Sequence, residues 1–352
     1  MVPRQRGALP DEAGHAYPAA SSNFVDRDSV PERASDATSG RQAHDKTETA
    51  DRAHVIVDRP DFQDHFGKLN PPDCYGDPLT LPDGTRMPLL NGRPERSQAE
   101  QGVLGDCGII ATLGAVAAHR PDDIADRVST DADGSYLVQL HDAEWTPEGI
   151  CAPTDKMIEL IITPNLPIYN KRPDIPAFAS ADRAAWTPVL EKAIAGTDQA
   201  WTPQQTADWA ATWDAICAED ANRGVKNPRS GPPPTGYVRL NQGSTPWERA
   251  ELLTQLTGQQ AGVLLCPDRP ADLNEILARQ LRENKPILVS ARPEKEKGEE
   301  LPHNLEASHV YEVVDIVEDK IVMRNPWNRQ QPEPMSPEQF VANMRHTYAT
   351  LI

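Results

Sequence analysis

The spacing of apolar residues predicts several helices along the chain. Residues 107–118 (CGIIATLGAVAA) are apolar on nearly every side, which is typical of a helix buried in a core. Asp106 directly precedes this segment and is a suitable N-cap, while Pro121 follows its end. Apolar residues at helical spacing predict further helices at 183–195, 273–284 and 336–349.

Other segments are short and rich in β-branched and aromatic residues. Such runs predict strands at 136–140, 157–162 and 286–292. Two more, at 308–317 (SHVYEVVDIV) and 320–325 (KIVMRN), are joined by Glu318-Asp319, so we expect an antiparallel hairpin. Pairing in that hairpin brings Asn325 close enough to His309 for its side-chain amide to reach the imidazole. Helices together with antiparallel strands indicate an α+β fold.

The composition changes along the chain and divides it into four parts. Residues 1–66 contain few large aliphatic side chains, so we expect a disordered leader there. A lobe bearing Cys107 is expected at 67–220, and a lobe bearing His309 and Asn325 at 236–352. The charged and proline-rich residues 221–235 between them read as a linker or surface loop.

The charge and cysteine content narrow the class of protein. The 352 residues carry a formal charge of −18, which argues against nucleic acid or an anionic membrane as a partner. No apolar run is long enough to span a bilayer, and no apolar segment of a secretion signal follows the first residues. The five cysteines are widely spaced, with neither zinc-site nor disulfide spacing. We expect a cytoplasmic monomer without cofactors or metals, or a protein exported by a route other than general secretion.

Cys107 lies where a nucleophilic thiol would be placed. A helix N-terminus stabilises a thiolate, and such a nucleophile needs an imidazole base and a group that orients the base. The predicted hairpin supplies His309 and Asn325 for these roles, and Gln101 on the preceding loop could donate to an oxyanion. The simpler interpretation is a buried core thiol, a strand-edge histidine, a turn asparagine and a loop-capping glutamine.

The motifs around these residues, taken together and in this order, resemble the core of the calpain-type cysteine proteases, which belong to the papain-like clan. The matching segments run in the family's order over roughly residues 90–352: QGVLGDC, LIITPNLPIYN, WTPVLEKAIA, HVYEV, RNPWN and SPEQFVANM.

This resemblance implies a two-lobed fold, with a helical Cys lobe, an antiparallel-sheet His/Asn lobe and a cleft between them. It implies an endopeptidase acting on polypeptides through a thioester. Cys107 would be the nucleophile, His309 the general acid and base, and Asn325 the residue that orients the imidazole. Gln101 would donate to the oxyanion, and Trp327 would shield the contact between His309 and Asn325 from water.

Three departures from the family pattern bear on this expectation. Gly108 stands where the family has tryptophan, which alters the cleft wall beside the thiol. The separation between Cys107 and His309 is longer than expected, and the proline-rich linker can absorb the excess. The family's calcium-binding acids correspond to Gln98 and Gln199, although Asp198 is adjacent, and no EF-hand loop is present.

The same residues allow other functions. A Cys-His-Asn site also supports acyl transfer to an amine, or deamidation. A protease fold with an altered cleft could instead bind extended peptides without cleaving them, and Gly108 keeps this alternative open.

Overall fold

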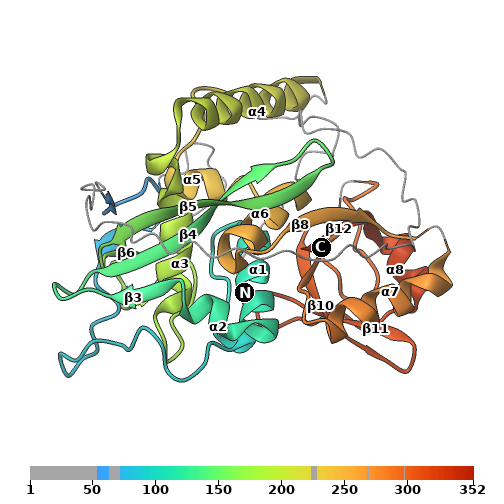
Figure 1. The fold of residues 1–352 in the computed structure, drawn as a ribbon, viewed down its shortest axis with the longest axis horizontal. Helices are drawn as coiled ribbons and strands as arrows, with labels where there is room; N and C mark the ends of the chain where they lie inside the picture. The colour runs from blue at the N-terminus through green and yellow to red at the C-terminus, as the bar shows by residue number, and fades with distance from the viewer. Residues whose placement is uncertain (1–53, 63–71, 223–227, 268, 297) are drawn as a thin grey trace, which may run out of the picture.

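The computed structural model describes residues 54–62, 72–222, 228–267, 269–296 and 298–352. These residues form eight α-helices, a nine-stranded sheet and a three-stranded sheet, which confirms the predicted α+β class (Figure 1). None of the helices in this described part is long and apolar enough to cross a bilayer.

The large sheet crosses the molecule without interruption. Its order is β11 (Lys320–Arg324), β10 (Val310–Val317), β9 (Ile287–Ala291), β12 (Met344–Leu351), β8 (Ala261–Leu265), β5 (Ile150–Ile162), β4 (Tyr136–Trp145) and β3 (Val128–Thr130). All these neighbours are antiparallel, and β1 (Val55–Val57) adds in parallel to β5. The small sheet comprises β2 (Cys74–Gly76), β6 (Leu166–Tyr169) and β7 (Arg172–Pro176).

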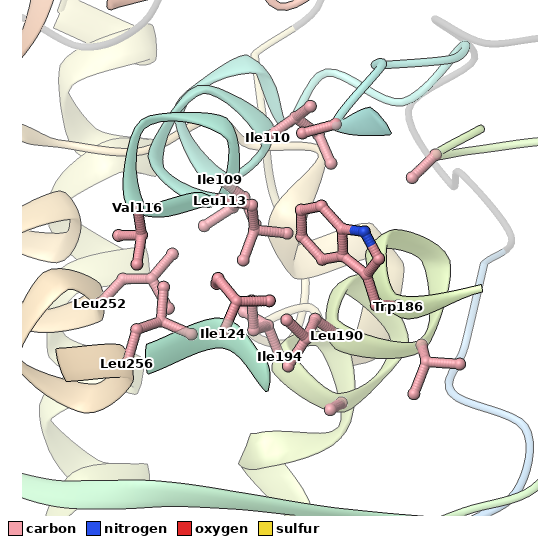
Figure 2. Packing of buried hydrophobic residues seen from close by; sticks show 14 of the residues in the cluster. Ile109, Ile110, Leu113, Val116, Ile124, Trp186, Leu190, Ile194, Leu252 and Leu256 are labelled. Carbon is pink, nitrogen blue, oxygen red and sulfur yellow. The ribbon is translucent and has the colours of Figure 1, made fainter. Parts of the chain in front are cut away.

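Helix α1 (Cys107–His119) is the centre of the larger core. Figure 2 shows Leu113 facing Trp186, and Val116 facing Leu252. The other helices are α2 (Pro121–Ala125), α3 (Trp186–Gly196), α4 (Pro203–Asn222), α5 (Gly236–Leu240), α6 (Pro246–Thr257), α7 (Pro270–Arg282) and α8 (Pro337–Asn343). Every residue of α1 from Cys107 to Ala117 is buried, so its almost wholly apolar surface is satisfied by packing alone.

The chain has two hydrophobic cores joined by one sheet. The first surrounds α1, α3 and α6, and the second lies among α7, α8 and strands β9 to β12. Strands β5 and β8 pair at Ile150–Gly262 and Cys151–Ala261, and this pairing joins the parts of the sheet that flank the two cores. The Cys-bearing segment 67–220 contributes strands β2 to β7 as well as helices α1 to α4, so it is not built of helices alone. Its β-branched runs pair into the shared sheet.

The hairpin prediction is confirmed. Strands β10 and β11 pair antiparallel, and the turn residues Glu318 and Asp319 have φ values of 49° and 60°. Two consecutive left-handed residues match the right-handed twist of the flanking strands. A bulge between Val313 and Asp315 shifts the register by one residue toward the end that carries the candidate site.

Two other expectations need correction. The helix predicted at 336–349 ends at Asn343, because Met344–Leu351 forms β12 and fills the place between β9 and β8. Residues 54–62 do not belong to a disordered leader, because β1 pairs with β5 and buries Val57. The leader's residues 1–53 and 63–66, and residues 223–227 of the linker, lie outside the described residues. The twenty-residue helix α4 was not predicted.

Candidate active site

The buried thiol of Cys107 lies beside the hairpin. Cys107 is the first residue of α1, and the backbone of Val310 lies close enough to its sulfur to lower the pKa of the thiol. Val310 begins β10 and directly follows His309. The structure therefore brings the N-terminus of α1 against the strand that carries the predicted base, across about 200 residues of sequence.

His309 and Asn325 are in direct contact. The Nε2 atom of His309 lies 3.0 Å from Oδ1 of Asn325, and both side chains are buried. Because Oδ1 can only accept, Nε2 carries the proton and Nδ1 is the basic nitrogen of the neutral ring. Asn325 is itself held, since Oδ1 also accepts from the Trp327 backbone at 3.0 Å and its Nδ2 donates to the Gln330 carbonyl at 3.2 Å.

Two aromatic rings enclose the imidazole. The ring of Trp327 lies 4.5 Å from that of His309, centroid to centroid, at an interplanar angle of 39°. Tyr311 meets the imidazole edge-on at 4.9 Å. This packing fixes the plane of the imidazole and keeps water from the His309–Asn325 contact. Trp327 therefore lies where the resemblance leads one to expect it.

Gln101 reaches the same site through its backbone. Its N–H donates to the carbonyl of Pro326 at 2.9 Å, next to Asn325. Its side-chain Nε2 donates to the Leu104 carbonyl at 2.6 Å, and its Oε1 has no hydrogen-bond partner among the described residues. One hydrogen of the Gln101 side-chain amide is thus bound within the loop. The role of Gln101 as an oxyanion donor remains a prediction.

Burial favours the neutral forms of Cys107 and His309. Loss of solvent raises the pKa of Cys107 to about 11, although the Val310 backbone and the Arg249 cation act in the opposite direction. Loss of solvent also lowers the pKa of His309 to about 4, and the hydrogen bond with Asn325 only partly offsets this. The site at rest holds a thiol and a neutral imidazole.

Gly108 is explained by a close neighbour. A side-chain carbon on Gly108 would lie 1.9 Å from Oγ of Ser244 and 3.2 Å from Cδ of Arg249. The fully buried guanidinium of Arg249 donates to the Ser244 carbonyl at 2.7 Å and to Oγ of Ser290 at 2.9 Å. Ser244 thus forms the wall for which the resemblance leads one to expect tryptophan.

A buried pair of carboxyl groups includes Asp106, the residue directly before Cys107. Asp106 occupies the N-cap position, but its side chain does not cap α1, and it lies close enough to Glu191 of α3 for each group to affect the pKa of the other. Glu191 also accepts from the backbone N–H of Ala179 at 3.1 Å. Burial raises the pKa of Asp106 to about 7 and that of Glu191 well above its usual range. Burial therefore favours the protonated forms of both carboxyl groups.

A buried ion network ties the loop before α1 to the hairpin. Glu312 of β10 is fully buried, with Arg96 Nη2 at 2.8 Å and Arg324 Nη1 at 3.7 Å. Arg324 also donates to the carbonyls of Arg96 and Ala99. This network was not predicted from the sequence, although a glutamate within the apolar run VYEVV is a signal, because a buried carboxylate needs a cationic partner.

The positions matched to calcium ligands bind protein groups instead. Oε1 of Gln98 accepts from Nε1 of Trp186 at 2.7 Å and from the Glu95 backbone at 3.0 Å. Asp198 accepts from the Gly236 backbone at 2.6 Å, and Gln199 is exposed. Across the described segments, no three His, Cys, Asp or Glu side chains are grouped as metal ligands. All five cysteines, each within a described segment, are free thiols.

Comparison with known protein families and with curated proteins gives no match for this chain.

Proposed function

We propose that this protein is a cysteine peptidase of the calpain type, with a two-lobed papain-like arrangement in which α1 carries the nucleophile and the β10–β11 hairpin carries the base. The observation that carries the proposal is the contact of His309 Nε2 with Asn325 Oδ1 at 3.0 Å. The thiol of Cys107 lies beside this pair, next to the backbone of Val310. A buried core cysteine does not require this arrangement.

The residues define a sequence of proton transfers. Nδ1 of His309 takes the proton of the Cys107 thiol as the sulfur attacks the peptide carbonyl carbon. Asn325 keeps Nε2 protonated and stabilises the imidazolium that forms. His309 then gives its proton to the leaving amine, the C–N bond breaks and a thioester remains. Water, deprotonated by His309, hydrolyses the thioester and restores the thiol.

The loops around the site and the side-chain amide of Gln101 must move for this reaction. Cys107 and His309 are buried, so a polypeptide reaches the sulfur only after the surrounding loops open. The amide of Gln101 must turn from the Leu104 carbonyl toward the developing oxyanion. Substrate binding supplies the free energy for both changes.

In this proposal the two cores are aligned without calcium. The Arg96–Glu312–Arg324 network and the bond from Gln101 to Pro326 hold the loop before α1 against the hairpin. Alignment by direct contacts leaves the reacting groups in register without an ion.

Incubation of the purified protein with an unfolded protein substrate tests the proposal. Cys107→Ala and His309→Ala should each abolish cleavage, while Cys266→Ala, which removes a partly buried thiol outside the site, should leave it unchanged. A peptidyl chloromethyl ketone should label Cys107 only when His309 is present. Full cleavage by Cys107→Ala would refute the proposal. Tight peptide binding without cleavage by the parent chain would favour the non-catalytic binding module, and amide hydrolysis at glutamine alone would favour deamidation.

A further inference from the structure

A second feature lies next to the candidate nucleophile. A pocket of about 510 Å³ is bounded by β4, α4, α5 and α6 and reaches the first turn of α1. Its apolar wall is made by Ile109, Ile194 and Leu252, which belong to the core drawn in Figure 2. Helix α4, at the top of Figure 1, contributes the opposite side.

Indole rings make up much of this pocket. Trp145, Trp201 and Trp209 line it, which is three of the seven tryptophans in the chain. Nε1 of Trp209 donates to the Pro234 carbonyl at 2.9 Å, so this ring is held in place. The guanidinium carbon of Arg239 lies 4.9 Å from the Trp201 ring, so one indole already contacts a cation.

The pocket also has an excess of negative charge. Its lining residues, all of them described, include four carboxylates and one guanidinium: Glu144, Asp208, Glu248, Glu251 and Arg239.

Arg239, the single cation among these lining residues, already has partners within the protein. Arg239 lies 3.5 Å from Asp198, and its Nη2 donates to the Ile194 carbonyl at 2.7 Å. Glu251 is different, because among the described ion pairs none holds it: it accepts a hydrogen bond from the neutral Gln255 at 3.3 Å, and the charge of Arg239 acts on it without direct contact. Loss of solvent, with Glu248 nearby, raises the pKa of Glu251 to about 7. A cation brought beside Glu251 would stabilise its ionised form.

The pocket shares a wall with the candidate active site. Gly243 and Ser244 line it, and Ser244 is the residue whose Oγ lies against Gly108, next to Cys107. A chain that lies across the thiol would have to pass Ser244 to place a neighbouring side chain in the pocket.

We propose that this pocket binds a lysine or arginine side chain of the polypeptide that the protein cleaves. The inference rests on the proposed function and adds a substrate class to it. The apolar stem of such a side chain would lie against the indoles, and its cation would meet Glu251. A neutral side chain of the same length would add nothing to the influence that Arg239 already has on Glu251.

Binding is tested apart from cleavage. The Cys107→Ala protein is titrated calorimetrically with two short alanine–serine peptides that differ only in one central residue, lysine or norleucine. We expect the lysine peptide to bind at least ~10-fold more tightly. Glu251→Gln should remove that preference without changing the affinity for the norleucine peptide. Glu275→Gln, an exposed position on α7 outside the pocket, is the matched control and should have no effect.

The outcomes separate the inference from the proposed function. Equal binding of the two peptides to the parent site would overturn the inference, even if Glu251→Gln fails to fold. Butylamine binding as tightly as the lysine peptide would also overturn it, because the pocket would then take a small amine rather than a polypeptide. Cleavage by the active protein without a preference for basic residues refutes the inference alone. A lysine preference in binding, with no cleavage, supports the pocket and refutes the peptidase.

Discussion

Replacing Glu312 by glutamine isolates the charge that holds the hairpin to the loop before α1. The substitution keeps the shape of the side chain and a hydrogen-bond acceptor for Arg96. It removes the only anion within 4.0 Å of Arg324 among the described ion pairs. Arg324 is buried, so its cation cannot regain solvent, whereas Arg96 is partly exposed and can.

The expected loss in the free energy of unfolding follows from the deeper burial of Arg324. Removing one partner of a buried ion pair costs about 3–5 kcal/mol. Arg324 keeps three oxygen acceptors, the Arg96 and Ala99 carbonyls and Oδ1 of Asn328, which places the loss near the lower end, at about 3 kcal/mol. His119, 3.9 Å from Glu312, adds little because burial lowers its pKa to about 4 and leaves it neutral.

Urea unfolding at pH 7 measures this loss. The matched control is Asp122→Asn, which removes the charge from an exposed pair with Arg93, where both side chains are more than two-thirds accessible. That control should lose less than ~1 kcal/mol. A loss in Glu312→Gln no larger than in the control would refute the view that this buried charge aligns the two cores.

Other predictions concern the candidate site directly. Gln101→Ala should lower kcat by ~10²-fold or more if the amide donates to the oxyanion, and Asn325→Ala should lower cleavage less than His309→Ala does; unchanged rates in Gln101→Ala would remove that residue from the mechanism. Alkylation of Cys107 by iodoacetamide should accelerate ~10-fold per pH unit between pH 7 and 9, because its pKa lies near 11, and a rate independent of pH would instead indicate a thiolate–imidazolium pair. The unfolded chain releases the Glu191 proton near pH 4.5, whereas the folded chain keeps it because its pKa is raised, so stability should fall from pH 5 to pH 8; Glu191→Gln should show a smaller fall in urea unfolding, and an equal fall would contradict the raised pKa. Cleavage should proceed at the same rate in millimolar calcium and in chelator, and a calcium-induced rise of ~10-fold or more would show that the ligand positions were misread.

Local patterns in the sequence predicted the elements that carry the candidate site. The apolar residues of 107–118 require burial on all sides, which defines α1 and places Cys107 at its start. The two-residue turn at Glu318-Asp319 sets the hairpin register, so the proximity of His309 and Asn325 followed from the sequence. The start of α1 and the register of the hairpin could both be predicted from residues that are near each other in the sequence.

Features that depend on distant contacts were not predicted. Nothing local to Asp106 indicates that its carboxyl group pairs with Glu191 rather than capping α1. Residues 344–351 have helical spacing but become β12, because a vacant position between two strands outweighs a weak local preference. Ser244 reaches Gly108 from a different segment, so the meaning of that glycine was visible only in three dimensions.

The place of β12 has a consequence for how the chain is made. It pairs with β9 on one side and with β8 on the other, although it follows all the other described strands in the sequence. During translation the sheet stays divided until residues 344–351 leave the ribosome, and pairings so distant in sequence form slowly. Until then no continuous sheet supports the contacts between the loop before α1 and the hairpin. Under the proposed function, a nascent chain would therefore have little capacity to cut itself or its neighbours before β12 is in place.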